Sequence, residues 1–265
     1  MYLNLLKEKI KKRFLIFLLK IPINKKLFLF LEHYISYSKG QGNPFSSLEF
    51  EINSCLSLLK KEPNIFIDIG SNKGEYLKKI INKYPKLECH IFEPSIINYQ
   101  FLKKSFKNKN YKINHLALSS VSKKGTLYAN YEGSALSSLY KRKLENINIK
   151  FKKTEEIKIL RFDEYWKDIN SIIDYVKIDV EGHELEVLKG FGPLINKVKL
   201  VQFEFGGTNI DSKTYIKDFW EFFSKRKFSL YRMTPQGNIL LNEYHEKEES
   251  FLFSNYIALN NHLVI

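Results

Sequence analysis

The stretch Tyr175-Val-Lys-Ile-Asp-Val-Glu-Gly-His-Glu-Leu-Glu-Val-Leu-Lys-Gly190 decides the fold class of this chain. The apolar residues between 172 and 178 predict a buried strand, and those between 185 and 188 predict the inner face of a helix. The join between strand and helix holds four acidic residues and a histidine: Asp179, Glu181, His183, Glu184 and Glu186. A buried strand that ends in a carboxylate and turns into a helix is where open α/β sheets place their chemistry.

Strands and helices alternate on both sides of this stretch. We expect strands at 65–69, 88–92, 111–118, 157–160, 175–179 and 198–205, and helices at 75–84, 96–106, 184–190 and 215–225. Further strands are expected near 228–232, 238–241 and 251–259, whereas the section between 118 and 157 reads as irregular. This alternation predicts a doubly wound, mostly parallel α/β sheet.

The first 60 residues read as a helical extension, and residues 61–265 as the α/β domain. A turn cluster at 38–44 interrupts the extension, and a helix is expected from Phe45 or Ser46 to Lys61. The first 26 residues hold eight lysines and arginines against one acid, Glu8. Their apolar residues recur every three or four positions, which predicts a basic amphipathic helix. Two roles stay open: lying on an anionic membrane face, or covering the domain or a homo-oligomer interface.

The net charge of +14 over 265 residues invites a nucleic-acid hypothesis. Lysine greatly outnumbers arginine, and no zinc-finger spacing or recognition-helix motif is present, so nucleic acid is not favoured as a partner. The longest apolar run, Phe14–Leu19, is too short to span a bilayer. Two cysteines cannot form a disulfide framework, and we expect reduced thiols in a cytoplasmic protein. That protein would be peripheral to the inner membrane face if its first helix binds lipid.

A glycine turn follows the strand at 65–69. Gly70 and Gly74 let the backbone turn tightly and approach a ligand, with helix N–H groups facing it. Their spacing lacks the glycine pattern that cradles a pyrophosphate, and Asp68 stands where a dinucleotide fold would keep a glycine. This favours a ligand with a cationic or zwitterionic group. Glu93, at the end of the next strand, is placed to bind the two hydroxyls of a ribose.

These segments together resemble the FkbM family of methyltransferases, which use S-adenosylmethionine. The resemblance runs in order from about residue 64 to 206 and rests on seven motifs: Asp68-Ile-Gly-Ser-Asn-Lys-Gly74, Phe92-Glu-Pro94, Leu116-Ala-Leu-Ser119, Ser134-Ala-Leu-Ser-Ser-Leu139, Leu160-Arg-Phe-Asp-Glu164, Lys177-Ile-Asp-Val-Glu-Gly-His-Glu184 and Val201-Gln-Phe-Glu204. The resemblance implies a class I, Rossmann-like sheet of seven mostly parallel strands, and O-methylation as the activity.

The resemblance also implies residues that hold the cofactor. The methionine end would lie against the glycine turn, the ribose against Glu93 and the adenine beside Leu116 and Ala117. The full predicted set is Asp68, Gly70, Ser71, Asn72, Gly74, Glu93, Pro94, Leu116 and Ala117.

Methyl transfer to an alcohol requires alignment of the acceptor and removal of a hydroxyl proton. Asp179 is our first candidate for the group that removes this proton, as a base or as a metal ligand, and His183 could also serve as the base. A metal version places Asp179, Glu204 and Glu181 as oxygen ligands of Mg²⁺, Mn²⁺ or Fe²⁺. In the alternative, Glu181 and Glu184 favour the N-terminus of the following helix. Glu184 and Glu186 are expected on the helix surface.

The acceptor is expected to be a sugar hydroxyl on a nucleotide-linked sugar or a surface glycan, as in polysaccharide biosynthesis. Serine hydroxyls could bind a polyol and nearby cations a diphosphate. The predicted substrate-binding residues are Ser137, Ser138, Lys141 and Arg142. Two alternatives stay open: an O-methyltransferase of a polyketide, lipid or small metabolite, and a non-enzymatic or nucleic-acid-binding module.

Overall fold

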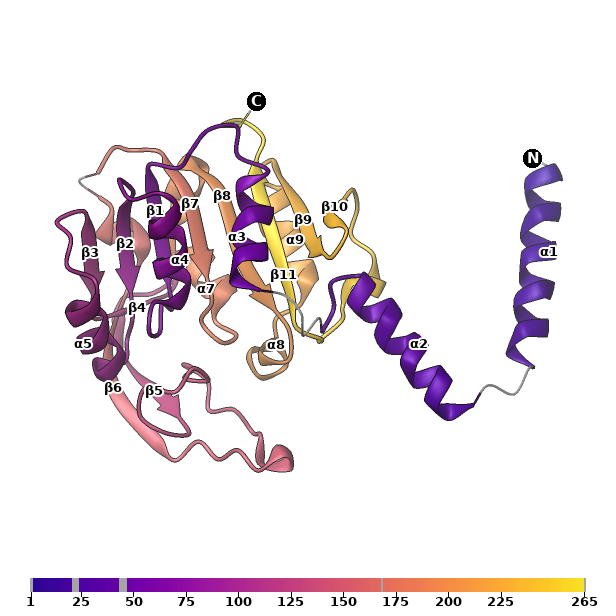
Figure 1. Cartoon of the computed structure of the whole chain (residues 1–265), viewed down its shortest axis with the longest axis horizontal. Helices are drawn as coiled ribbons and strands as arrows, with labels where there is room; N and C mark the ends of the chain where they lie inside the picture. The colour runs from indigo at the N-terminus through magenta and orange to yellow at the C-terminus, as the bar shows by residue number, and fades with distance from the viewer. Residues whose placement is uncertain (1, 21–23, 43–46, 168, 265) are drawn as a thin grey trace.

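The computed structural model describes residues 2–20, 24–42, 47–167 and 169–264. At its centre lies an eight-stranded sheet (Figure 1). The strands follow one another in space as β10 (Gly237–Leu241), β9 (Phe228–Thr234), β11 (Ser254–Asn260), β8 (Val198–Phe205), β7 (Ile173–Ile178), β1 (Ile65–Ile69), β2 (Glu88–Phe92) and β3 (Tyr111–Asn114).

The five strands β8, β7, β1, β2 and β3 are parallel to one another. Strand β11 is antiparallel to both β8 and β9, and β10 is antiparallel to β9. The predicted mostly parallel α/β sheet is confirmed. It has eight strands where seven were expected, because β9 turns back at Gly237 and pairs with β10 as a hairpin.

Helices cover both faces of the sheet. On one face lie α3 (Leu48–Leu56), α4 (Glu75–Lys83) and α5 (Ile96–Ser105), and on the other lie α6 (Phe162–Tyr165), α7 (Glu184–Gly190) and α9 (Ile216–Ser224). The strands serve both layers because side chains alternate along a strand. In β1, Phe66 packs in the cluster under α4, whereas Ile67 and Ile69 pack in the cluster under α7.

The chain order reverses at the centre of the sheet, between β1 and β7. From β1 the chain continues outward through β2 and β3, whereas β7 and β8 build the other side. A crevice opens at the carboxyl ends of the strands at such a switch point. The backbone N–H of Asp179 donates to the carbonyl of Ile69 at 3.0 Å, which holds the two strand ends together.

A smaller three-stranded sheet adjoins this edge, with β6 (Lys153–Leu160) between β4 (Ala117–Leu118) and β5 (Lys123–Ala129). Strand β5 lies in the section that reads as irregular from sequence. Gly125 and the exposed residues beside it hide the strand pattern. A Cβ on Gly125 would lie 2.4 Å from the Ile159 side chain, so this glycine permits close strand packing and does not mark a turn.

The N-terminal region forms two separate helices, α1 (Tyr2–Leu19) and α2 (Lys25–Ser38), where one helix was expected over the first 26 residues. The Asn24 side chain caps α2 by accepting from the Lys26 N–H at 2.9 Å. No helix in the described ranges is long and apolar enough to cross a membrane.

Helix α3 begins at Leu48 and ends at Leu56, within the helix expected from residue 45 or 46 to 61; residues 45 and 46 lie outside the described ranges. It packs Ile52 and Cys55 into the core. The domain boundary at residue 60 stays a prediction.

Candidate active site

A cavity opens at the carboxyl ends of β1, β2 and β7 and encloses about 570 Å³, part of it open to solvent. Eleven of the residues predicted from the sequence line it: Gly70, Asn72, Glu93, Pro94, Leu116, Ala117, Ser137, Ser138, Asp179, Glu181 and His183. The other predicted residues do not line this cavity: Asp68, Ser71, Gly74, Lys141, Arg142 and Glu204. We call it the first cavity.

Gly70 permits the tight approach of the turn after β1 to the end of β7. Its φ is +82°, and a Cβ there would lie 1.9 Å from the carbonyl oxygen of Asp179. Any side chain at this position would push the two strand ends apart.

Asp68 and Ser71 lie buried beneath the glycine turn. The Ser71 hydroxyl donates to one carboxylate oxygen of Asp68 at 2.6 Å, and the other oxygen has no hydrogen-bond partner among the described residues. Burial raises the pKa of Asp68, while the charge of Lys177 opposes the rise. A buried acceptor without a partner is a place where a ligand's amino group, or a water bound to it, would be stabilised.

Glu93 ends β2 and is bound by two backbone donors. Its carboxylate oxygens accept from the N–H groups of Asn72 at 2.8 Å and of Ser95 at 2.9 Å. Burial raises its pKa to about 7, although both hydrogen bonds lower it. Each oxygen keeps a further lone pair, so the carboxylate can also accept from two adjacent hydroxyls.

The far wall of the first cavity is apolar and suits a flat ring. Leu116 and Ala117 stand there as predicted, and the structure adds residues that sequence reasoning missed: Phe92, Asn98, Leu118, Leu127 and Leu139. Asn98 is 2% exposed, and its side-chain oxygen has no partner among the described residues. Its position four residues before the buried Leu102, on the inner face of α5, was a signal that could have found it.

A second cavity of about 1060 Å³, part of it open to solvent, adjoins the first. The two share Gly70, Asn72, Ala135 and Asp179 on their walls. Of the acidic side chains in the described part of the chain, Asp179 alone lines both. Its carboxylate accepts from the Lys177 ammonium at 3.0 Å and is 38% exposed.

Lys177 is held in its charged form. Burial alone would lower its pKa, but the carboxylates of Asp179 and Asp68 raise it above its ordinary value. Its ammonium also lies 5.1 Å from the centre of the Tyr76 ring. This fixed positive charge lies beside the carboxylate of Asp179.

Glu204 comes from the strand next to Asp179. β7 and β8 are parallel with Ile178 opposite Phe203, so the two acids follow at neighbouring strand ends. Glu204 lines the second cavity. Burial raises its pKa well above the ordinary value, and the negative charges of Asp179 and Glu181 raise it further.

His183 lies on the wall of the first cavity and does not line the second. Its two ring nitrogens contact the Tyr140 hydroxyl at 3.2 Å and the Ser119 hydroxyl at 2.9 Å. Burial lowers its pKa to about 4, so the ring is neutral at neutral pH. Its role as a base stays a prediction, and the geometry gives it two hydroxyl partners that hold the ring in place.

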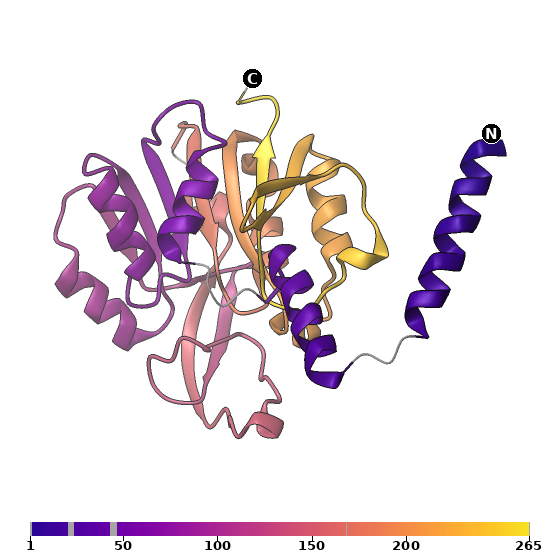
Figure 2. The ribbon, with the colours of Figure 1, turned by 45° about the vertical axis from the view of Figure 1, so that its right-hand side comes forward.

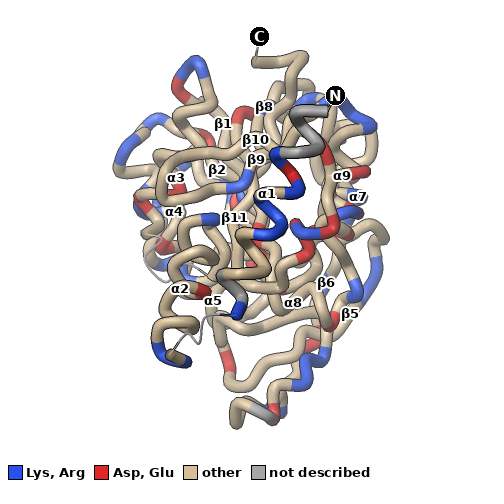
Figure 3. The backbone as a smooth tube through the Cα atoms, turned by 90° about the vertical axis from the view of Figure 1, so that its right-hand side faces the viewer, with Lys and Arg blue, Asp and Glu red and all other residues tan. Residues whose placement is uncertain are grey.

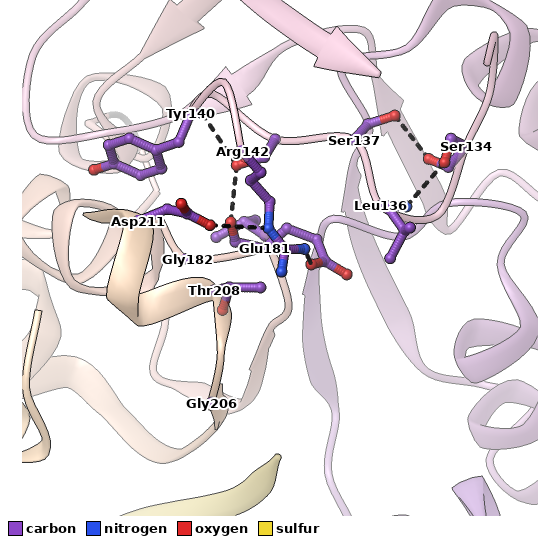
Figure 4. A network of polar contacts seen from close by, with 12 residues as sticks. Ser134, Leu136, Ser137, Tyr140, Arg142, Glu181, Gly182, Gly206, Thr208 and Asp211 are labelled. Carbon is purple, nitrogen blue, oxygen red and sulfur yellow. Dashed lines mark hydrogen bonds and ion pairs between the residues drawn. The ribbon is translucent and has the colours of Figure 1, made fainter. Parts of the chain in front are cut away.

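Arg142 ties the segment after β5 to the strand end of β7 (Figure 4). Its guanidinium donates to Glu181 at 2.9 Å and to Asp211 at 3.2 Å, at the end of α8 (Thr208–Ser212). The Ser138 hydroxyl donates to the Glu181 carbonyl at 2.8 Å. Arg142 is thereby engaged by carboxylates, whereas Lys141 is exposed. Their predicted contact with a diphosphate stays a prediction.

Glu184 was expected on the surface of the helix, and that prediction is wrong. It is 1% exposed, and one of its oxygens accepts from the N–H groups of Val180 and Gly182 at 3.1 and 3.0 Å. The side chain folds back over the loop that precedes its own helix, because Gly182 (φ +99°) turns those N–H groups inward.

The predicted metal centre is not assembled. Among the described residues no three His, Cys, Asp or Glu side chains are grouped to hold a metal ion. Two of the three predicted ligands have cationic partners, Asp179 with Lys177 and Glu181 with Arg142.

The sequence matches the FkbM methyltransferase domain over residues 68–230, more than half of the chain. The chain belongs to this family. The match begins at Asp68 in β1 and ends at Leu230 in β9, so it includes β2 and β7 but not α1, α2 or α3. The resemblance stated from the motifs is confirmed, and the sheet order is that of class I methyltransferases with one strand added. No curated protein matches the chain.

Solved structures show a weak likeness to this FkbM-family chain. A precorrin-6y C5,15-methyltransferase from Geobacter metallireducens GS-15 is 12% identical, with a TM-score of 0.42 over 83% of this chain and 92% of that one. The plantazolicin methyltransferase BamL, solved with a triazolic desmethylPZN analog and S-adenosylhomocysteine, is 10% identical, with a TM-score of 0.46 over 81% of this chain and 85% of that one. M. capricolum TrmK, solved with S-adenosylhomocysteine, is 12% identical, with a TM-score of 0.40 over 82% and 69%. No substrate is assigned from them.

Proposed function

We propose that this protein is an O-methyltransferase that uses S-adenosylmethionine to methylate a hydroxyl of a sugar. The observation that carries the proposal is the pair of adjoining cavities with Asp179 on their shared wall. One cavity has the donors and acceptors that suit the cofactor, and the other is open to an acceptor.

The residues of the first cavity fit S-adenosylmethionine. Glu93 would accept from the ribose hydroxyls, and the apolar wall at Leu116 and Ala117 would flank the adenine. Asp68 does not line the cavity; its carboxylate oxygen without a hydrogen-bond partner among the described residues lies beneath the glycine turn and would attract the amino group, directly or through a water. When bound, the cofactor supplies an electrophilic methyl group on a sulfonium sulfur. The protein's task is to align the acceptor oxygen and remove its proton.

Asp179 is the residue that we propose to receive that proton. It is partly exposed to both cavities, and Lys177 holds the carboxylate in place. Burial and, next, the negative charge of Asp179 raise the pKa of Glu204 well above its ordinary value, which favours the protonated form of Glu204.

The lining of the second cavity supports a sugar as the acceptor. It presents four acids, two lysines and three aromatic residues: Glu51, Glu75, Asp179, Glu204, Lys73, Lys177, Tyr76, Tyr131 and Phe253. Carboxylates accept hydrogen bonds from hydroxyl groups. The excess of acids disfavours a diphosphate in this cavity, which favours a glycan over a nucleotide-linked sugar. Ser137 and Ser138 line the first cavity and not the second.

The test is methyl transfer from isotope-labelled S-adenosylmethionine to a panel of neutral glycans, nucleotide sugars, lipid alcohols and small polyketides. We expect label on a glycan hydroxyl, with slower labelling of nucleotide sugars. Exclusive labelling of a lipid or polyketide would replace sugar with a different alcohol as the acceptor. Turnover that is lost on chelation and restored by one metal would overturn the metal-free step at Asp179.

A further inference from the structure

Helix α1 lies apart from the α/β body in two views of the molecule, and α2 leads from it to the body (Figures 1 and 2). Twelve of the twenty-five exposed large hydrophobic side chains in the described part of the chain belong to them. These are Ile10, Phe14, Leu15, Ile16 and Phe17 on α1, and Leu27, Phe28, Leu29, Phe30, Leu31, Tyr34 and Ile35 on α2. Exposed apolar side chains gathered in this number on two neighbouring helices indicate an interaction surface.

Helix α2 has an apolar face, and Leu29 and Phe30 add exposed apolar side chains beside it. Leu27, Phe28, Leu31, Tyr34 and Ile35 recur at the spacing of a helix face, and no residue of α2 is buried. Phe28 is 57% exposed and Tyr34 is 61% exposed. Inside a folded protein such a face is covered, so it needs a partner.

The charge of the same segment identifies that partner. Residues 1–38 hold eight lysines and arginines against two glutamates, Glu8 and Glu32. Lysine and arginine recur along α1 (Figure 3). A second copy of the chain would bring an equal excess of positive charge to the contact and repel it. The surface of a membrane with acidic lipids has anionic headgroups above apolar acyl chains. It therefore matches both the positive charge and the apolar side chains of α1 and α2.

The end of α2 is fixed to the body next to the second cavity. The Arg232 guanidinium donates to the Lys39 carbonyl at 2.7 Å, and the N–H of Gly42 donates to the Phe253 carbonyl at 2.6 Å. A Cβ on Gly40 (φ +73°) would lie 1.9 Å from the Met233 carbonyl oxygen, so the chain lies directly against β9. Phe253 is itself a wall residue of the second cavity. Helices that rest on a membrane would therefore hold this cavity close to the lipid surface.

We infer that α1 and α2 bind the anionic lipid surface of a membrane, with their apolar side chains among the acyl chains and their lysines at the headgroups. This inference is independent of the proposed methyl transfer. It requires the helices, their apolar faces and their charge, and it requires nothing of the cofactor site.

The test is sedimentation of the full chain with vesicles of phosphatidylcholine alone and of phosphatidylcholine with phosphatidylglycerol. We expect binding to the mixed vesicles, weakened by salt. Lys11→Glu with Lys12→Glu should weaken binding by tenfold or more, because each lysine near an anionic surface contributes about fivefold. Phe28→Ser with Phe30→Ser should also weaken it. Neither pair alters a buried residue, and thermal unfolding checks that the fold is kept.

The matched control is Lys103→Glu with Lys104→Glu on α5, which changes the net charge equally at an exposed place on the body. It should retain vesicle binding. Equal binding of this control and of the α1 variant, or no binding to anionic vesicles, would overturn the inference. So would self-association, measured by light scattering, that the α2 variant abolishes. Binding of S-adenosylmethionine by the same variants reports separately on the proposed function.

Discussion

At the scale of single residues, Asp179 is the base that we propose for the methyl transfer. It shares a wall with both cavities, and its partner is the buried cation Lys177. His183, the other candidate base, is neutral and has a hydroxyl beside each ring nitrogen. The two residues therefore make opposite predictions for substitution.

Asp179→Asn should lower kcat by 10²- to 10⁴-fold while leaving the affinity for S-adenosylmethionine within about threefold, because the amide cannot take a proton. His183→Asn should lower the melting temperature more than it lowers kcat. Steady-state kinetics, calorimetric binding and thermal unfolding would check the two variants, with Glu49→Gln, an exposed acid on α3, as the control. A His183→Asn enzyme with no turnover and full stability would move the base to His183.

Glu93 should make the free energy of unfolding fall as pH rises. Its pKa is about 7 in the folded protein against an ordinary value of 4.5, so the folded state binds more protons between these values. The free energy of unfolding therefore falls as pH rises from 4.5 to 7, by up to about 1.4 kcal/mol per unit from this group. Urea unfolding across this window should show a shallower fall for Glu93→Gln. An equal slope in both proteins would contradict the raised pKa.

At the scale of elements, α3 is joined to the sheet by a buried polar network around Gln202. The Gln202 side-chain oxygen accepts from the hydroxyls of Tyr76 and Tyr175 at 2.6 and 2.5 Å and from the Cys55 thiol at 3.4 Å, and its amide donates to Glu51 at 2.9 Å. Burial raises the pKa of both tyrosines, so they stay protonated donors.

Gln202→Ala should lower the free energy of unfolding by roughly 2–4 kcal/mol, because several buried donors lose their acceptor at once. Gln100→Ala, at an exposed position on α5, is the matched control and should change it by less than about 0.5 kcal/mol. Denaturant melts of the two variants would check this. A loss for Gln202→Ala as small as for the control would show that the network contributes nothing.

The elements around the cavities were predictable where their pattern was regular. The buried strand before Asp179 and the glycine turn after β1 follow from apolar runs and from glycines, and the parallel sheet follows from their alternation. Strand β5 was not predicted, because Gly125 and its exposed neighbours interrupt the alternation of apolar and polar residues that marks a strand. The separation of α1 from α2 was not predicted either, because the apolar spacing of a helix continues in the sequence up to the residues near Pro22. The burial of Glu184 depends on a loop bent at Gly182, a tertiary contact that spacing does not reveal.

At the scale of the whole molecule, the protein has an α/β body with a hydrophobic core on each face of the sheet. The helices α1 and α2 precede this body, and none of the described residues of α2 is buried. Directly after α2, Lys39 and Gly40 lie against β9 and fix the chain to the body. Catalysis and membrane binding are therefore expected to separate.

A chain that begins at Lys39 should melt within about 2 °C of the full chain, because the removed helices contribute little to the core. Its affinity for S-adenosylmethionine should be unchanged and its binding to anionic vesicles lost. Calorimetry and vesicle sedimentation on the two chains would check this. A melting temperature lowered by 10 °C or more would place α1 and α2 in the folded core.

The most direct test of the central claim is calorimetric titration of S-adenosylmethionine into the full chain. We predict saturable binding of one cofactor per chain, and an affinity at least about tenfold lower for Glu93→Ala, which loses charge-assisted hydrogen bonds to the ribose. Glu49→Ala should bind as the unaltered protein does. Absence of binding to the unaltered protein, or equal binding by Glu93→Ala, would contradict the placement of the cofactor in the first cavity.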